Sequence, residues 1–187
     1  MQDNHLSLAD SYITLADLYV EFNDETKFDE AKKLYIDAYR IVYGKLGANN
    51  VKCGICHLGQ GKTLMKINDV ESSLEKFQEA FGLFENDENA LEYLVETLYS
   101  IGVCYTMRNK KDQALAIFEE AYSICKEDFN NYDSKLADLL IEMAKIRGES
   151  NENQKALEYY KEACTISRNI FYLLIFIYIL GILGATY

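Results

Sequence analysis

The strongest pattern along the chain is a recurring triplet: a small residue, an aromatic residue four positions later and an alanine three positions after that. It occurs four times, and its final alanines are 42, 41 and 42 residues apart. Residues at i, i+4 and i+7 share one face of an α-helix, so each triplet predicts a helix that admits a close neighbour and fills the gap with a ring. The triplets are Ala31-Tyr35-Ala38, Ser73-Phe77-Ala80, Ala114-Phe118-Ala121 and Ala156-Tyr160-Ala163.

A second series of positions repeats with the same period, twelve residues upstream of each triplet: Tyr19, Gly61, Gly102 and Ala144. It indicates a partner helix before each triplet helix, with a short polar turn between the two. Because a single helical hairpin cannot bury its own apolar face, we expect consecutive hairpins to stack into a solenoid. The expected helix pairs are 5–23 with 28–43, 50–66 with 70–85, 89–107 with 111–126, and 134–147 with 153–168.

The chain resembles the tetratricopeptide repeat family over about residues 12–168. The third repeat carries the family signature most fully, at Leu98, Ile101, Gly102, Tyr105, Ala114, Phe118 and Ala121. A spacing near 42 residues, with Leu46-Gly47 after the first pair, is similar to the longer repeats of kinesin light chains and related adaptors. The His-Pro that follows this Leu-Gly in kinesin light chains is absent, and no heptad coiled coil precedes the repeats. The resemblance therefore implies the repeat class and not a motor role.

The fold class implied by this resemblance is all-α: a right-handed superhelical solenoid of four antiparallel helical hairpins, with an apolar C-terminal helix. The four repeats of the array, residues 5–168, are expected at about 5–43, 50–85, 89–126 and 134–168. The apolar C-terminal segment is expected at 170–187.

The resemblance also implies a concave groove, lined by the first helix of each hairpin at positions i, i+3, i+7 and i+10. The second and third stripes mix apolar and polar residues, which suits an extended or helical peptide with apolar anchors. The alternative is that several of these residues pack between repeats. The stripes are Ile13, Ala16, Val20 and Asn23; Ile55, Leu58, Lys62 and Met65; Glu96, Tyr99, Val103 and Thr106; Asp138, Ile141, Lys145 and Gly148. The residues expected to contact the partner are Leu58, Lys62, Met65, Tyr99, Val103, Thr106, Ile141 and Lys145.

Two specialised uses of such a groove are not favoured. Chaperone-type members of the family hold a terminal carboxylate with Lys and Asn side chains, but Lys62 and Lys145 are two repeats apart here. Kinesin-light-chain-like repeats hold the peptide backbone with a row of asparagines. The corresponding positions in this chain are Asp17, Gly59, Ser100 and Glu142.

Composition and charge narrow the function further. Hydrophobic residues make up 49% of the chain, which therefore has enough apolar side chains to form a core. Lysine and arginine number 19 against 30 acidic residues, and the net charge of -11 has the wrong sign for a protein that binds nucleic acid through phosphates. Five cysteines, an odd number, and the lack of a secretory start predict a reducing, cytoplasmic location.

Two short motifs resemble chemical sites. Cys53-Gly54-Ile55-Cys56-His57 has the spacing of c-type haem attachment, and Gly59-Gln60-Gly61-Lys62-Thr63 resembles the end of a phosphate-binding loop. Neither has its required context, because both lie in a predicted helix and Cys56 stands where the loop needs its first glycine. We therefore expect no catalytic, cofactor-binding or metal-binding residues, and no enzyme activity. A nucleotide-binding enzyme or a haem protein is the remote alternative.

The C-terminal segment from Ile170 to Tyr187 contains no charged residue. As a helix its eighteen residues would be about 27 Å long, close to the thickness of a bilayer core. Three interpretations remain: a tail anchor with the repeats facing the cytosol, a strip buried by a partner, and a truncated array. The sequence thus predicts a non-catalytic adaptor or scaffold, with a tail-anchored receptor as the alternative. It leaves the partner and the oligomeric state open.

The tail-anchor interpretation makes a direct prediction about extraction. If 170–187 is inserted in a bilayer, the full chain will stay with the membrane fraction after carbonate extraction, and a chain lacking 170–187 will be released. Immunoblotting of pellet and supernatant measures this. Release of the full chain by carbonate would rule the anchor out.

Overall fold

The computed structural model describes residues 3–127 and 133–184, with side chains over 5–126 and 134–168. Within these ranges the chain is helical apart from short connections, and no strand occurs. The all-α class predicted from the repeat is therefore confirmed. The chain forms two compact units, residues 1–114 and 115–187, which are treated separately below.

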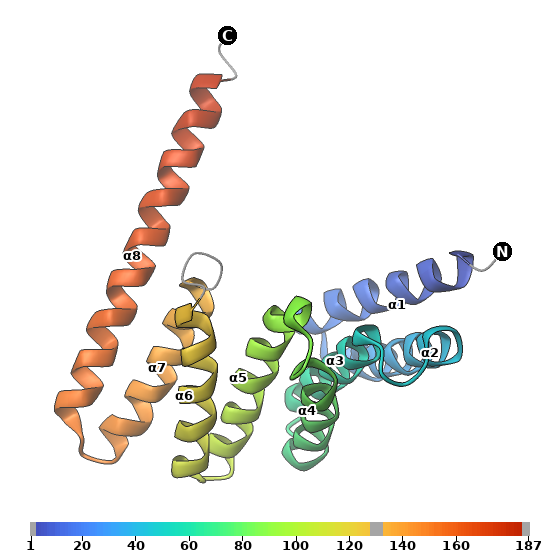
Figure 1. Ribbon diagram of the computed structural model, residues 1–187, viewed down its shortest axis with the longest axis horizontal. Coiled ribbons are helices and arrows are strands. Elements are labelled where there is room, and N and C mark those ends of the chain that lie inside the picture. Colours follow the sequence, from blue (N-terminus) through green and yellow to red (C-terminus); the bar gives the residue numbers. More distant parts are fainter. Residues whose placement is uncertain (1–2, 128–132, 185–187) are drawn as a thin grey trace. The chain divides into compact units, whose positions relative to one another are not determined.

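The helices begin and end close to the expected positions. The first unit holds α1 (Asp3–Glu21), α2 (Phe28–Leu46), α3 (Val51–Lys66), α4 (Val70–Phe84) and α5 (Leu91–Met107), with short 3-10 turns at Glu25–Lys27 and Glu88–Ala90 (Figure 1). The second unit holds most of α6 (Lys111–Glu127), together with α7 (Asp133–Glu149) and α8 (Asn153–Gly184). Only α8 differs clearly from its expected range of 153–168, because its helical backbone continues to Gly184.

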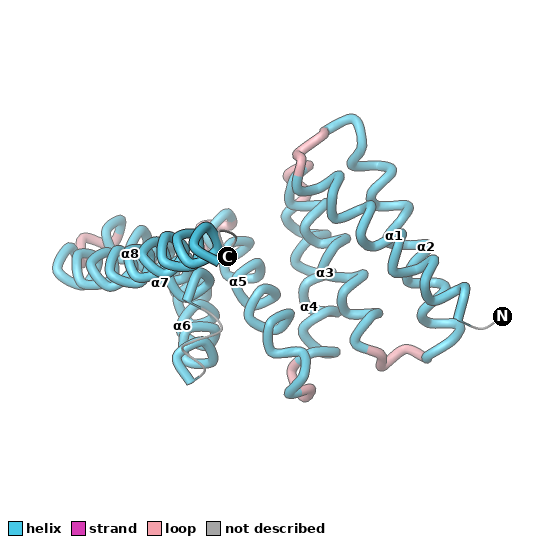
Figure 2. Tube along the Cα trace, turned by 90° about the horizontal axis from the view of Figure 1, so that it is seen from above, coloured by secondary structure: helices cyan, strands magenta, loops and turns pink. Residues whose placement is uncertain are grey.

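In the first unit, each helix packs against the next one along the chain. α1 with α2 and α3 with α4 form antiparallel hairpins, and α2–α3 and α4–α5 are the contacts between successive hairpins (Figure 2). The first helices of the hairpins also meet, since α1 contacts α3 and α3 contacts α5. One side of this unit is therefore built from α1, α3 and α5.

The rings of the first two triplets are the centre of this packing, and Tyr35 and Phe77 are both fully buried. In the second unit Phe118 is also fully buried, whereas Tyr160 is 40% exposed. A Cβ atom added to Gly59 would collide with the ring of Tyr35, and one added to Gly61 would collide with the ring of Phe77. Because Tyr35 is on α2 and Gly59 on α3, a ring packed on a glycine backbone holds two successive hairpins together.

The hairpin turns also repeat. Within the described residues, four asparagines adopt positive φ angles. Asparagine tolerates this conformation, which ends a helix, better than most residues do. In two hairpins the aspartate that follows the asparagine is an N-cap. Asp24 caps the 3-10 turn before α2, and its Oδ1 accepts a hydrogen bond from Thr26 N at 3.0 Å. Asp69 caps α4, and its Oδ1 accepts a hydrogen bond from Ser72 N at 3.2 Å. The asparagines are Asn23 (52°), Asn68 (62°), Asn109 (57°) and Asn151 (62°).

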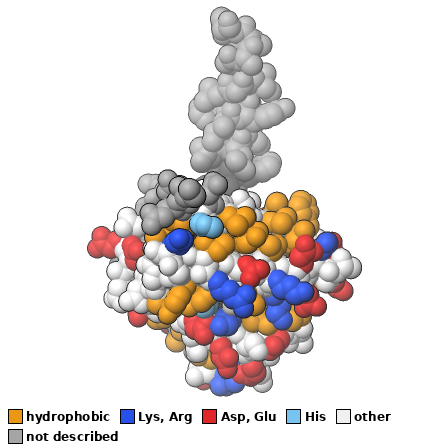
Figure 3. All heavy atoms as spheres, turned by 90° about the vertical axis from the view of Figure 1, so that its right-hand side faces the viewer, with side chains coloured by type: hydrophobic (Ala, Val, Ile, Leu, Met, Phe, Trp, Pro, Cys, Tyr) orange, Lys and Arg blue, Asp and Glu red, His pale blue; other side chains and the backbone are white. Residues whose placement is uncertain are grey.

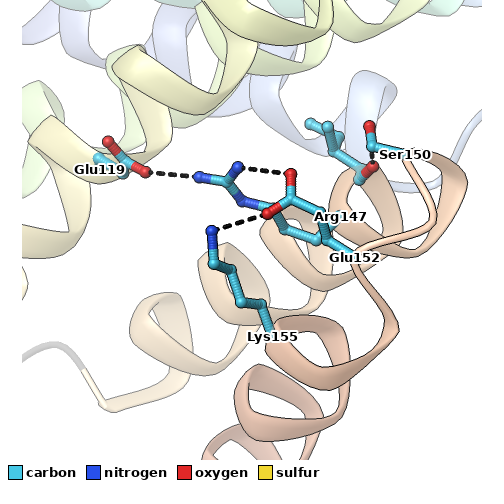
Figure 4. Close-up of polar contacts among 6 residues, drawn as sticks. Glu119, Arg147, Ser150, Glu152 and Lys155 are labelled. Carbon is cyan, nitrogen blue, oxygen red and sulfur yellow. Dashed lines mark hydrogen bonds and ion pairs between the residues drawn. The ribbon is translucent and has the colours of Figure 1, made fainter.

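In the second unit a charged cluster joins three helices (Figure 4). Arg147, near the end of α7, contacts Glu119 of α6 at 3.3 Å and Glu152, just before α8, at 2.9 Å. Lys155 of α8 lies 2.7 Å from the same Glu152. Hydrogen bonds from Lys155 and Arg147 lower the pKa of Glu152, so this carboxylate stays ionised and keeps both cations in place.

The three interpretations of the apolar end concern residues 170–187, whose side chains lie outside the described part of the chain. The backbone of α8 is helical to Gly184. Among the helices as far as the structure describes them, none is long and apolar enough to cross a membrane.

Replacing Gly59 with alanine tests the contact between ring and glycine. The added methyl group of Gly59→Ala would force the buried Tyr35 ring to move, so we expect a loss of about 1–3 kcal/mol in the free energy of unfolding. Urea denaturation followed by circular dichroism measures it. The matched control is Gly82→Ala on α4, whose new Cβ would meet nothing within 4 Å and should add about 0.5–1 kcal/mol through helix propensity. Equal effects of the two substitutions would contradict the packing argument.

Candidate functional site

A pocket of about 330 Å³ opens among α1, α3, α4 and α5, on the side built from the first helices. Its apolar lining consists of Val20, Met65 and Phe77. Each comes from a different helix, and each helix is positioned by the stacking described above. The polar lining consists of Glu21, Lys62, Lys66, Glu96 and Ser100.

An ion pair crosses this pocket. Lys62 Nζ of α3 lies 2.8 Å from Glu96 Oε1 of α5, with the two side chains 33% and 26% exposed. Both residues belong to the groove stripes predicted from the sequence. The pair neutralises part of the groove and leaves a mixed surface. Acidic, basic and hydrophobic side chains are likewise interspersed on the face of the molecule drawn in Figure 3.

The structure brings together only some of the predicted contact residues. Lys62 and Met65 both line the pocket. Leu58, one turn earlier on α3, is 2% exposed and lies in the core. The position of Leu58 agrees with the alternative stated above, in which some stripe residues pack between repeats.

The remaining predicted residues lie elsewhere. Tyr99, Val103 and Thr106 are half-buried on α5, and the Thr106 hydroxyl donates to Gly102 O of its own helix at 3.0 Å. Ile141 and Lys145 are on α7 in the second unit. Lys145 Nζ pairs there with Glu142 at 2.6 Å.

Six residues of the pocket were not among the predicted contacts. Val20 and Glu96 belong to the predicted stripes, whereas the stripes did not include Glu21, Lys66, Phe77 and Ser100. Glu21 and Lys66 each follow a stripe residue directly, so a stripe drawn two residues wide would have included them. Ser100 was considered only as a substitute for a backbone-binding asparagine. Phe77 had been assigned to helix packing alone, and its access to the pocket depends on how α4 crosses α3.

A partly buried hydrogen bond lies beside this pocket. The hydroxyl of Tyr35 donates to Asp17 Oδ1 of α1 at 2.5 Å. Burial raises the pKa of Asp17, while the Tyr35 hydrogen bond and the charge of Lys62 act in the opposite direction. Burial, together with Asp17, raises the pKa of Tyr35, so the phenol stays protonated and remains a donor.

A second hollow, of about 570 Å³, lies over α2, α3 and α4, and Tyr39, His57, Lys76 and Glu79 contribute to its lining. His57 Nδ1 is 3.0 Å from Glu79 Oε2, yet this buried nitrogen makes no hydrogen bond of good geometry. Burial lowers the pKa of His57, and nearby Lys76 lowers it further, while Glu79 opposes both. The imidazole is therefore mainly neutral at neutral pH, and its ring packs on Tyr39.

The C-x-x-C-H motif lies within helix α3. Cys53 and Cys56 are fully buried. Burial raises the pKa of both thiols, that of Cys56 to about 12, so both are protonated at neutral pH. Among the described residues, no group of three or more His, Cys, Asp or Glu side chains could hold a metal ion.

The segment that resembles a phosphate-binding loop is also helical. Thr63, which such a loop would use for a cation, is fully buried and donates its hydroxyl to Gly59 O at 2.8 Å. Gly61 packs on Phe77, and Lys62 pairs with Glu96. The residues of this motif thus have packing and pairing roles in the fold.

The stacked hairpins define an all-α helical-repeat fold. Residues 93–169 match the sequence model of the tetratricopeptide repeat family, which confirms the resemblance. A comparison with curated protein sequences gives no match.

Solved structures share this fold. Aspartyl phosphate phosphatase F from Bacillus subtilis superposes with a TM-score of 0.78 at 20% identity, over 89% of this chain and 42% of that one. A Rap protein complexed with competence and sporulation factor has a TM-score of 0.75 at 16% identity, and the match covers 87% of this chain and 43% of that one. A putative kinesin light chain of Podosopora anserina with TPR-like repeats has a TM-score of 0.71 at 14% identity, and the match covers 88% of this chain and 77% of that one. The chain spans less than half the length of the first two, and at these identities the likeness concerns the fold alone.

The partly buried Asp17 carboxyl predicts a pH dependence of stability. The pKa of Asp17 is higher in the folded chain than in the unfolded chain, so the folded chain binds this proton more tightly. The free energy of unfolding therefore falls as the pH rises above about 4. An asparagine at this position can still accept the hydrogen bond from the Tyr35 hydroxyl but cannot ionise. We expect the stability of Asp17→Asn relative to wild type to increase between pH 4 and 7, measured by urea denaturation at each pH. A relative stability that decreases over this range would refute the assignment.

Proposed function

We propose that the chain is a non-catalytic adaptor or scaffold that binds a protein or peptide partner in the groove formed by α1, α3 and α5. The observation that carries the proposal is the pocket whose apolar floor is bordered by the Lys62–Glu96 pair. Apolar concavities with a few placed polar groups are typical binding sites for peptide side chains. Of the similar structures, one is a Rap protein complexed with competence and sporulation factor, which supports a binding role for this fold.

The lining suggests the chemistry of the partner. Val20, Met65 and Phe77 would receive one apolar side chain of an extended or helical peptide. Glu21 and Glu96 would accept hydrogen bonds from basic groups or peptide N–H groups beside that anchor. With a net charge of -11 on the chain, a partner with a basic or mixed surface is favoured over an acidic one.

The remaining elements of the proposal rest on the sequence. Tyr99, Val103 and Thr106 of α5 would extend the groove along the same helix as Glu96, and Ile141 and Lys145 would act in the second unit. No catalytic residue, cofactor or metal is assigned. The location we propose is the cytoplasm, with anchoring through 170–187 as the alternative arrangement of the same adaptor.

Replacing two groove residues tests the proposal. Tyr99 and Lys62 are partly exposed, so Lys62→Ala with Tyr99→Ala should leave the helical content intact while removing a charge and an aromatic contact. Proteins bound to the full chain in a cytosolic extract are measured by quantitative mass spectrometry, with wild type and variant in parallel. Because aromatic residues are frequent anchors, we expect the specific partners to fall by roughly tenfold or more.

The matched control is Lys76→Ala in the hollow over α2, α3 and α4, a lysine of similar exposure on another face. It should retain the partners. Partners retained by the groove variant but lost with Lys76→Ala would place binding on that other face. No partner above background in any sample would remove the support for an adaptor.

A further inference from the structure

Helix α1 carries a stripe of exposed apolar side chains. Leu8, Leu15, Leu18 and Phe22 are 40%, 38%, 41% and 79% exposed. Their spacing of seven, three and four residues puts them on one helix face, away from the buried face of α1 that includes Ala9 and Ala16. We call Leu8, Leu15, Leu18 and Phe22 the α1 stripe.

The repeat reveals what this face does in the other hairpins. In the register that aligns Tyr19 with Gly102, Leu15 and Leu18 correspond to Leu98 and Ile101 of α5. Those two residues are only 1% and 5% exposed, and α5 packs on α4 of the preceding hairpin. In α3 the corresponding residues are His57 and Gln60, which are half-buried, and the His57 ring packs on Tyr39 of α2 in the preceding hairpin. We infer that the α1 stripe is the face that contacts a preceding hairpin elsewhere in the array.

Helix α8 carries the complementary face. Leu157 and Tyr160 are 47% and 40% exposed, and Cys164 on the same face is exposed too. We call Leu157, Tyr160 and Cys164 the α8 stripe. The equivalents of Tyr160 are fully buried: Tyr35, Phe77 and Phe118. Leu157 corresponds to the buried Leu74 and Leu115 and to the half-buried Lys32, and the equivalents of Cys164 are half-buried.

Tyr35 shows how this second face is covered. Its ring on α2 packs on Gly59 of α3, the first helix of the following hairpin. Tyr160 stands at the same repeat position as Tyr35 and is 40% exposed. The α8 stripe is thus the face that receives a following hairpin elsewhere in the array.

We propose that the α8 stripe of one copy packs against the α1 stripe of a second copy, head to tail. This contact would reproduce, between chains, the α2–α3 and α4–α5 contacts made within the first unit. It requires no new kind of packing, because the same repeat positions already pair there. The proposal is independent of the groove and of its partner.

Charge supports this pairing over a symmetric one. Helix α1 contains four acidic residues and no lysine or arginine, and one of them, Asp10, already pairs with Lys52 of α3. On α8, Lys155, Lys161 and Arg168 stand against Glu158 and Glu162, so its polar part has one excess positive charge. Lys161 and Arg168 follow Leu157 by four and eleven residues and so lie beside the α8 stripe. Packing α8 on α1 puts these two cations near an acidic helix, whereas α1 on α1 would bring two acidic helices together. Since the two faces differ, the contact is heterologous and can extend beyond a dimer.

The test uses the full chain with one end blocked at a time. Leu18→Glu with Phe22→Glu blocks the α1 stripe, and Leu157→Glu with Tyr160→Glu blocks the α8 stripe. All four side chains are exposed, so both variants should fold, which circular dichroism checks. Sedimentation velocity over a concentration series should show the mass of wild type roughly doubling or more, and each blocked variant remaining a monomer.

Mixing the two blocked variants is the decisive experiment. Each retains one intact end, so together they should form a one-to-one dimer that neither forms alone. A control variant, Ile67→Glu, alters an apolar residue of similar exposure outside both stripes and should associate like wild type.

Four results would overturn the proposal. They are a monomeric wild type at the highest concentration, no dimer on mixing, loss of association in Ile67→Glu, and association that persists in both blocked variants. The last would place self-association elsewhere, for instance in 170–187.

Discussion

The contact on which the rest of the structure depends is an aromatic ring packed against the backbone of a glycine on a neighbouring helix. Tyr35 on Gly59 holds α2 to α3, and Phe77 on Gly61 holds α4 to α3. Such a contact requires both partners: a ring large enough to fill the gap and a residue without a side chain to provide it. Interiors are packed so densely that the addition of one methyl group changes the arrangement.

The groove is a consequence of this packing. The Tyr35 ring of α2 and the Phe77 ring of α4 both pack on glycines of α3. The helices α1 and α5 therefore contact α3 along its remaining face. That position lets Lys62 reach Glu96 and brings Val20 and Phe77 to the same pocket. The same packing buries Tyr35, so its hydroxyl needs a hydrogen-bond acceptor inside the protein. Asp17 accepts this hydrogen bond, although burial of its carboxyl is unfavourable.

Much of the fold follows from the sequence because its period is strong. The triplets locate the second helices, and the turn asparagines separate the helices of each hairpin. The groove follows less completely. Lys62 and Met65 were expected and line the pocket, but Leu58 is in the core and Phe77 reaches the pocket from α4. A helical stripe predicts which residues share a face, but the crossing of neighbouring helices determines which of them stay open.

By itself the sequence determined the period of the repeat, the helices and their turns, and the class of repeat protein, because these depend on contacts between residues close along the chain or one period apart. Only the tertiary structure decided which equivalent positions are covered. Phe77 and Tyr160 hold the same place in their triplets, yet one is fully buried and the other is 40% exposed. Burial at these positions is provided by neighbouring helices and not by the triplet itself, so no local pattern can distinguish them.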